Sequence, residues 1–119
     1  MESVLGIGGV FFRGRDPERL RAWYAEHLGL ELEDYGGTTF EAGAGDQTVW
    51  SIFPGDTAYW PAEQQAMVNY RVRELDAVLA RLRDAGVEVD DRVEEHEYGR
   101  FGWAVDLEGN RFELWQPPS

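Results

Sequence analysis

Two stretches of the chain place apolar residues three or four positions apart, the spacing of an amphipathic helix. The first is expected to begin at Asp16 and Pro17, since aspartate caps helices and proline suits their first turn. Gly29 follows its last apolar residue, where glycine commonly ends a helix. The second begins near Glu74 and ends at Gly86. The two apolar faces comprise Leu20, Trp23, Tyr24, His27 and Leu28, then Leu75, Val78, Leu79, Leu82 and Ala85.

Strand-like segments precede and follow each predicted helix. They are rich in β-branched and aromatic residues and are separated by glycine-containing turns, such as Gly36-Gly37 and Glu108-Gly109-Asn110. In the first half they cover residues 8–13, 30–33, 38–41 and 48–53; in the second they cover 67–72, 87–90, 101–105 and 111–115.

Both halves therefore have the order strand, helix, strand, strand, strand, which indicates an internal repeat. Residues 10–16 overlay 68–74, and the alternating segment 30–33 overlays 87–90. Gly45-Asp46 likewise overlays Gly109-Asn110, each before the last strand of its half. We expect a single domain, 1–119, with repeat modules 5–54 and 66–117 joined by a linker at 55–65.

Composition narrows the possible chemistry. The 119 residues include no cysteine, which excludes disulfides, thiolate zinc sites and a cysteine nucleophile. All 11 cationic residues are arginines, so this chain offers no lysine for Schiff-base chemistry. A net charge of −12 argues against nucleic-acid binding. Without a signal-like N-terminus or a long apolar run, the sequence predicts a cytoplasmic protein with no membrane partner.

Several sequence pieces resemble one known family. They are residues 9–16 (Gly-Val-Phe-Phe-Arg-Gly-Arg-Asp), 70–76 (Tyr-Arg-Val-Arg-Glu-Leu-Asp) and, most specifically, 106–114 (Asp-Leu-Glu-Gly-Asn-Arg-Phe-Glu-Leu). With Trp23-Tyr24 and residues 27–30, they make the chain similar to small bacterial members of the glyoxalase/bleomycin resistance/dioxygenase (vicinal oxygen chelate) superfamily. The resemblance implies an α+β fold of tandem βαβββ modules, with curved mixed sheets around a cavity and helices outside.

The resemblance also implies where a metal would sit in metal-using relatives. Carried over through the repeat, the four ligand positions are Gly9, Val49, Met67 and Glu113. Only Glu113 has the oxygen donors that zinc, iron or manganese prefer, because glycine and valine have none and a thioether suits soft copper. We therefore expect no metal at this site and no cofactor.

Strand alternation predicts which side chains line the expected cavity, because residues two apart on a strand share a face. Around Glu113 we expect an aromatic-lined site that holds an amide and several guanidinium groups, as small-molecule sites commonly combine apolar walls with a few polar groups. The predicted ligand-binding residues are Phe11, Arg13, Met67, Asn69, Arg71, Trp103, Arg111 and Trp115.

Glu113 and Asn69 each allow two interpretations. Glu113 is the candidate catalytic residue, as a general base or hydrogen-bond acceptor; alternatively it forms an ion pair with Arg71, Arg13 or Arg111. Asn69 either orients a ligand or is a hydrogen-bonding partner of Glu113. Trp103 and Trp115 either stack on a planar ligand or fill the core.

Other chemistry-bearing residues are expected to be structural. His96, in a charged loop at 94–98, is read as solvated surface rather than a metal ligand, although an unusual metal site there stays open. His27 is read as a packed core histidine. Trp50, Tyr59 and Trp60 are expected to fill core or a dimer interface rather than form a lid.

Three functions follow from these features. The first is metal-independent binding of a small organic molecule. The second is an enzyme, either a metal-dependent lyase or dioxygenase with displaced ligands, or a metal-free isomerase that uses Glu113 as its base. The third is a regulatory or scaffold module; homodimers are common in the family, and pairing would cover strand edges.

Overall fold

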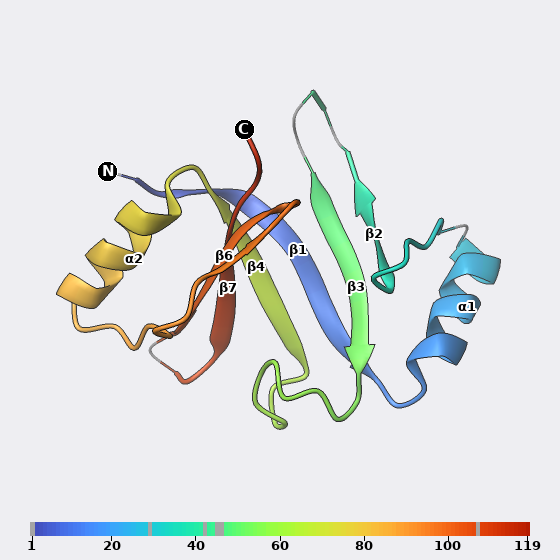
Figure 1. Ribbon diagram of the computed structural model, residues 1–119. Coiled ribbons are helices and arrows are strands. Elements are labelled where there is room, and N and C mark those ends of the chain that lie inside the picture. The colour runs from blue at the N-terminus through green and yellow to red at the C-terminus, as the bar shows by residue number, and fades with distance from the viewer. Residues whose placement is uncertain (1, 29, 42, 45–46, 107) are drawn as a thin grey trace. The chain divides into compact units, whose positions relative to one another are not determined.

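The computed structural model describes residues 2–28, 30–41, 43–44, 47–106 and 108–119, with the backbone alone at 23, 24 and 26–28. The described chain contains two helices and seven strands, and each helix is followed by three strands (Figure 1). Gly29, Gly45-Asp46 and the side chain of His27, all named above, lie outside the described residues. The elements are β1 (Val4–Gly14), α1 (Pro17–Leu28), β2 (Gly37–Phe40), β3 (Thr48–Pro54), β4 (Ala66–Val72), α2 (Leu75–Asp84), β5 (Glu94–His96), β6 (Gly99–Val105) and β7 (Arg111–Gln116).

The chain divides into two compact units. One comprises Met1–Gly8 with Met67–Ser119, and the other comprises Gly9–Ala66. Strand β1 therefore contributes its first residues to one unit and the remainder to the other. No helix in the described part of the chain is long and apolar enough to cross a membrane.

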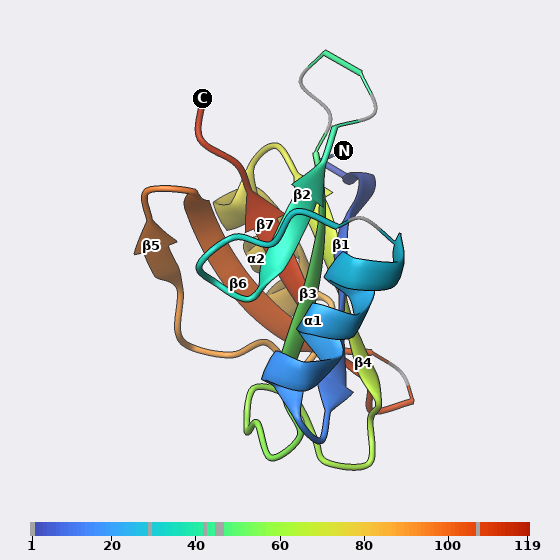
Figure 2. The same cartoon turned by 90° about the vertical axis from the view of Figure 1, so that its right-hand side faces the viewer.

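In the unit Gly9–Ala66, β3 lies between β1 and β2. It pairs in parallel with β1 and antiparallel with β2. Helix α1 begins as predicted, because the side chain of Asp16 accepts a hydrogen bond from the backbone N–H of Arg19 at 3.2 Å. The helix packs against this sheet (Figure 2), and a β-carbon at Gly14 would meet side-chain atoms of Ile52 and Leu20.

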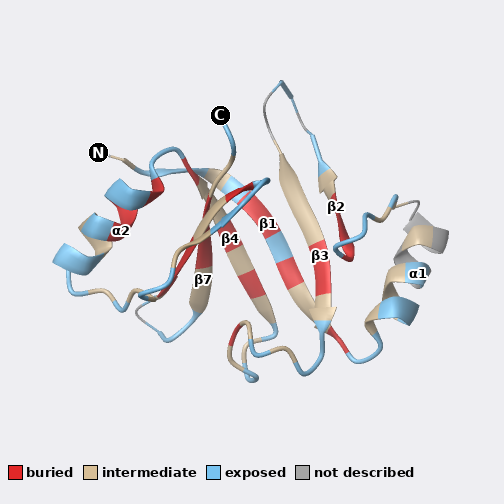
Figure 3. Cartoon of the chain, viewed as in Figure 1, coloured by how far each residue is buried: buried red, intermediate tan, exposed pale blue. Residues whose placement is uncertain are grey.

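In the other unit, α2 covers one face of a sheet in the order β1-β4-β7-β6-β5. Its buried residues pack with those of two strands, and Figure 3 shows the outer side of the helix exposed. The backbone N–H of Leu75, at the helix start, donates to the side-chain oxygen of Gln116 at 2.8 Å. A side chain from β7 thus caps the helix, since Glu74 at the N-cap makes no side-chain cap bond. The core consists of Val72, Leu75, Val78, Leu79 and Leu114.

Three predicted segments differ from the structure. Residues 30–33 form no strand; the backbone N–H of Glu33 bonds the carbonyl of Gly37 in a turn where Gly36 has φ +90°. Residues 87–90 form only an isolated bridge from Val89 to Ala104. Residues 30–33 lose the pairing to a local turn, whereas Glu88 and Asp90 bond the backbone of β6 only around the bridge at Val89.

The third difference is β5, which was predicted as a charged loop. It pairs antiparallel with β6, and its charged side chains are compatible with this position at the edge of the sheet. The order strand, helix, strand, strand, strand is therefore correct for the part of the chain from β4 to β7, but with 94–96 in place of 87–90. From β1 to β3, the described residues have one strand fewer than predicted.

Candidate functional site

Strand pairing brings three predicted site residues together on β4, β7 and β6. Asn69 is the register partner of Glu113 in the parallel β4–β7 pair, and Trp103 is its partner in the antiparallel β6–β7 pair. The alternation predicted for β7 is confirmed, because Leu114 lies in the α2 core with Phe112 packed against it. Glu113 consequently lies on the opposite face of the sheet from α2.

The turn between β6 and β7 sets this register. The side chain of Asp106 accepts hydrogen bonds from the backbone N–H groups of Glu108 and Asn110, both at 2.9 Å. These bonds, above all that from Asn110, lower the pKa of Asp106 below its ordinary value. The most specific part of the family-like motif therefore forms a tight turn that starts the strand carrying Glu113.

Glu113 is a buried carboxylate with a hydrogen bond on each oxygen. Its side chain is 2 % exposed. The side-chain amide of Asn69 donates to Oε1 at 2.6 Å, and the indole N–H of Trp103 donates to Oε2 at 2.9 Å. Hydrogen bonds to an ionised carboxylate are stronger than those between neutral groups, so these two donors favour the charged form. Asn69 therefore hydrogen-bonds Glu113, as one of its two sequence interpretations expected.

Asn69 also has an acceptor that the protein leaves unused. Asn69 is 2 % exposed, and its side-chain oxygen Oδ1 has no hydrogen-bond partner. This oxygen lies against Gly8, where a β-carbon would collide with it. Most buried polar atoms in proteins are hydrogen-bonded, so an unsatisfied one calls for a water molecule or a ligand.

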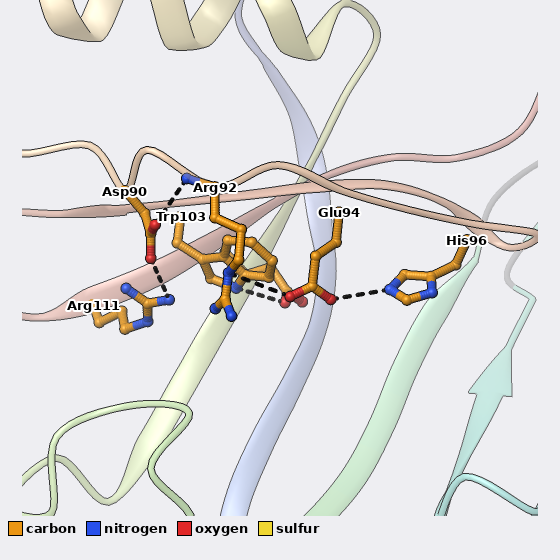
Figure 4. Close-up of polar contacts among 7 residues, drawn as sticks. Asp90, Arg92, Glu94, His96, Trp103 and Arg111 are labelled. Carbon is orange, nitrogen blue, oxygen red and sulfur yellow. Dashed lines mark hydrogen bonds and ion pairs between the residues drawn. The ribbon is translucent and has the colours of Figure 1, made fainter.

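Two arginines lie against the ring of Trp103 (Figure 4). The guanidinium carbon of Arg92 is 4.9 Å from the ring centroid and that of Arg111 is 5.5 Å from it. Each arginine also has an acidic partner, Arg111 with Asp90 at 3.2 Å and Arg92 with Glu94 at 3.4 Å. The backbone N–H of Arg92 is the main cause of a lowered pKa at Asp90, and Arg111 adds to it. The result is a row of alternating charges over Trp103.

His96 extends this row. Its ring nitrogen Nε2 is 3.1 Å from an oxygen of Glu94, and the ring stacks on Tyr98 with centroids 5.0 Å apart. The imidazole is 39 % exposed, which agrees with its interpretation as a surface residue. Among the described residues, no three histidine or acidic side chains are grouped so that they could hold a metal.

The remaining predicted residues of this unit differ in how accessible they are. Met67 is fully buried and Arg71 is partly exposed. Trp115 is 5 % exposed, stacks on Phe101 with centroids 6.1 Å apart, and donates its indole N–H to the carbonyl of Tyr98 at 2.9 Å. Trp115 therefore already has partners for its ring and its N–H.

Two predicted ligand-binding residues lie in the unit Gly9–Ala66. Phe11 stacks on Phe53 at 5.4 Å. The guanidinium of Arg13 donates to five backbone carbonyls and stacks over Trp60 at 5.0 Å, so it holds the segment after β3. The acceptors are the carbonyls of Gly55, Thr57, Trp60, Pro61 and Gln64, at 2.7 to 3.2 Å.

The aromatic residues Trp50, Tyr59 and Trp60 have different packing partners. Tyr59 and Trp60 pack against Phe53, with centroids 5.4 and 4.9 Å away. Trp50 instead contacts Phe12 edge-on at 5.5 Å. Since Trp60 is 2 % exposed, it fills core in this unit.

The four positions that hold a metal in related proteins do not suit one here. In one unit, Gly9 and Val49 are register partners without donor side chains, and a β-carbon at Gly9 would lie 2.5 Å from the carbonyl oxygen of Val49. In the other, Met67 offers a thioether, and both oxygens of Glu113 accept N–H groups. This donor set does not fit a divalent metal.

Sequence reasoning missed Asp90, Arg92 and Glu94. Asp90 stood at the end of a predicted strand, and the other two belonged to a charged stretch that is usually solvated surface. Their contact with the site depends on where the chain crosses Trp103 before β5. No signal in the sequence locates that crossing.

Together, the two helices and the mixed strand pairing define a small domain of the α+β class. The chain belongs to the Glyoxalase/Bleomycin resistance protein/Dioxygenase superfamily, whose family model matches residues 6–114. The family resemblance and the fold class expected from the sequence are thereby confirmed. No curated protein sequence matches the chain.

Solved structures of the same fold include two epimerases. A Streptomyces coelicolor methylmalonyl-CoA epimerase variant, in complex with 2-nitronate-propionyl-CoA, has a TM-score of 0.75 at 19 % identity, covering 98 % of this chain and 100 % of that one. The Mycobacterium tuberculosis methylmalonyl-CoA epimerase has 0.64 at 22 %, covering 98 % and 90 %. A Legionella pneumophila structure described as an NAD-dependent benzaldehyde dehydrogenase has 0.63 at 13 %, covering 92 % and 98 %. At these identities the similarity shows the fold alone.

Proposed function

We propose that this protein binds a small organic molecule beside Glu113 and Asn69. The observation that carries the proposal is the side-chain oxygen of Asn69, a buried acceptor without a protein donor. A ligand O–H or N–H group would satisfy it. Glu113, held by Asn69 and Trp103, would add a fixed negative charge next to that acceptor.

The surroundings support an organic ligand. Trp103 is buried beside the carboxylate and Phe101 stacks on Trp115 in the same unit, so aromatic groups border the polar ones. Arg92 and Arg111, each paired with an acidic side chain, lie against the ring of Trp103. This combination suits a molecule with a flat apolar part and at least one hydrogen-bond donor.

The test is a titration of the protein with planar aromatic and cationic organic compounds, followed by tryptophan fluorescence and calorimetry. Asn69→Ala should weaken binding roughly 2- to 10-fold, the value of a hydrogen bond worth about 0.5–1.5 kcal/mol. Ser51→Ala, which removes a buried hydroxyl in the unit Gly9–Ala66, is the matched control and should leave affinity unchanged. No response across a broad set of compounds, or affinity indifferent to Asn69 and Glu113, would contradict the proposal.

A second candidate is a metal-free isomerase in which Glu113 moves a proton. The burial of this carboxylate favours it, because a base held out of bulk water can be tuned for proton transfer. Methylmalonyl-CoA, the compound in the names of the epimerases with this fold, is a first substrate to try. Exchange of its α-hydrogen in heavy water should occur with the wild type and vanish in Glu113→Gln while the domain stays folded. Absence of exchange in the wild type would remove this substrate.

We also propose that the protein acts as a homodimer in the cytoplasm. Val4, Leu5 and Ile7, in the part of β1 that precedes Gly9, each remain about half exposed, and such apolar surface favours association. Light scattering should give twice the mass of one chain. Ile7→Glu should shift the protein toward a monomer, and a monomeric wild type at micromolar concentration would count against pairing.

A further inference from the structure

Glu113 is the one family metal position that keeps an oxygen donor, and its oxygens already serve another purpose. Oε1 accepts the Asn69 amide at 2.6 Å and Oε2 accepts the Trp103 indole N–H at 2.9 Å. All three residues are at most 2 % exposed. A metal at this carboxylate would have to share its oxygens with the buried Asn69 amide and the buried Trp103 indole N–H.

We infer that Asn69 and Trp103 do for Glu113 what a bound metal does in metal-using relatives, namely keep a buried carboxylate ionised and fixed in orientation. Two N–H donors on opposite oxygens hold the group in one plane and partly offset its charge. Trp103 in turn lies against the guanidinium groups of Arg92 and Arg111, each of which is paired with an acidic side chain. The charge of Glu113 is offset directly by the Asn69 amide and the Trp103 indole N–H.

Asn69 is the residue on which the replacement of a metal by hydrogen-bond donors depends. It lies directly opposite Glu113 in the β4–β7 pairing, so its side-chain nitrogen occupies a position from which a ligand atom could face the carboxylate. An oxygen there would create two adjacent carboxylates, which repel one another unless a proton or a cation lies between them. With the side-chain nitrogen of Asn69 at this position, the site is hydrogen-bonded. With a carboxylate oxygen of aspartate in its place, the site should attract a divalent cation.

The experiment compares wild type, Asn69→Asp and Asn69→Leu, purified without chelators or metals. Each is titrated with Mn²⁺, Co²⁺ and Zn²⁺ at mildly alkaline pH and followed by calorimetry and thermal unfolding. Wild type and Asn69→Leu should show no saturable response. Asn69→Asp should gain a saturable rise in its unfolding midpoint by mass action, and adding Glu113→Gln to it should abolish that rise.

Two results would overturn the inference. One is stoichiometric metal binding by the wild type that Glu113→Gln removes; the other is a folded Asn69→Asp protein, as judged by circular dichroism, that does not respond to any of the three metals. Should Asn69→Asp fail to fold, the wild type and Glu113→Gln still decide between the alternatives. The outcome is independent of the organic ligand, so a failure to find that ligand would leave this test intact.

Discussion

The side-chain oxygen of Asn69 occupies the space that a β-carbon would fill at Gly8. The glycine allows β1 to run close to β4, and the amide uses that room to keep its nitrogen directed at Glu113. The absence of a side chain at Gly8 is therefore part of the site.

Gly8→Ala should displace Asn69 from Glu113. The added methyl group cannot avoid the buried amide without a shift of the strand or a new rotamer, and such overpacking typically costs about 1–3 kcal/mol. We expect a lower midpoint in chemical unfolding and weaker ligand binding together. Gly6→Ala is the matched control on the same strand, since its β-carbon would lie 3.4 Å from Arg71, at the edge of ordinary contact. Equal stability of the two variants would show that Asn69 can move at little cost.

Arg13→Lys should destabilise the segment after β3. A guanidinium has five N–H donors in a planar fork, whereas an ammonium has three on one atom and cannot reach five separate carbonyls. Partly buried carbonyls that lose their donors should lower stability by about 1–3 kcal/mol. Urea unfolding followed by tryptophan fluorescence would measure this, because Trp60 lies under the guanidinium. Arg15→Lys, at an exposed position two residues away, should change little.

Gln116→Leu should weaken the start of α2. The backbone N–H of Leu75 would lose the side-chain oxygen that caps it, and loss of a helix cap costs about 1 kcal/mol. Gln116→Glu keeps an acceptor and places a negative charge at the positive end of the helix, so it should equal or exceed wild-type stability. Thermal unfolding of wild type, Gln116→Leu and Gln116→Glu gives their order of stability. A Gln116→Glu protein as unstable as Gln116→Leu would mean that the cap bond does not matter.

Acid should loosen the turn between β6 and β7. Hydrogen bonds from Asn110 and Glu108 hold the pKa of Asp106 below its ordinary value of 3.8, so its contribution to stability is present above that value. The contribution is lost as the pH falls through the lower pKa of the folded state. Asp106→Asn should therefore reduce stability most near neutral pH and converge with wild type once the pH is below the lowered pKa of Asp106 in the folded state. Asp91→Asn, also exposed, controls for the loss of one charge; a constant difference at all pH values would contradict this account.

The sequence predicted both helices and the side chains around Glu113 because each depends on local spacing. Neighbouring residues alone predict the helix start at Asp16 and the alternation of side chains in 111–115. The strand expected at 87–90 was wrong for a related reason. Alternation shows that a segment could pair but not over what length it does, and here the pairing with β6 is a single bridge at Val89 with backbone bonds from Glu88 and Asp90.

The role of Arg13 was beyond the sequence for a different reason. The alternation of side chains along a strand predicts that Arg13 shares a face with Phe11. Its five acceptors, however, are backbone carbonyls, which every residue has, so the sequence does not identify them. The row of charged side chains from Asp90 to His96 similarly depends on the path of the irregular segment that leads into β5. Only three-dimensional placement distinguishes these contacts from those of any exposed arginine or glutamate.

The parallel pairing of β4 with β7 has a consequence for how the site comes into being. Asn69 and Glu113 are 44 residues apart, and the carboxylate gains this donor only when the last strand docks. Contacts between distant residues form slowly because a long loop must first be closed. Binding competence therefore requires β4 and β7 to be paired, which would make ligand binding a measure of how much chain has reached the native state.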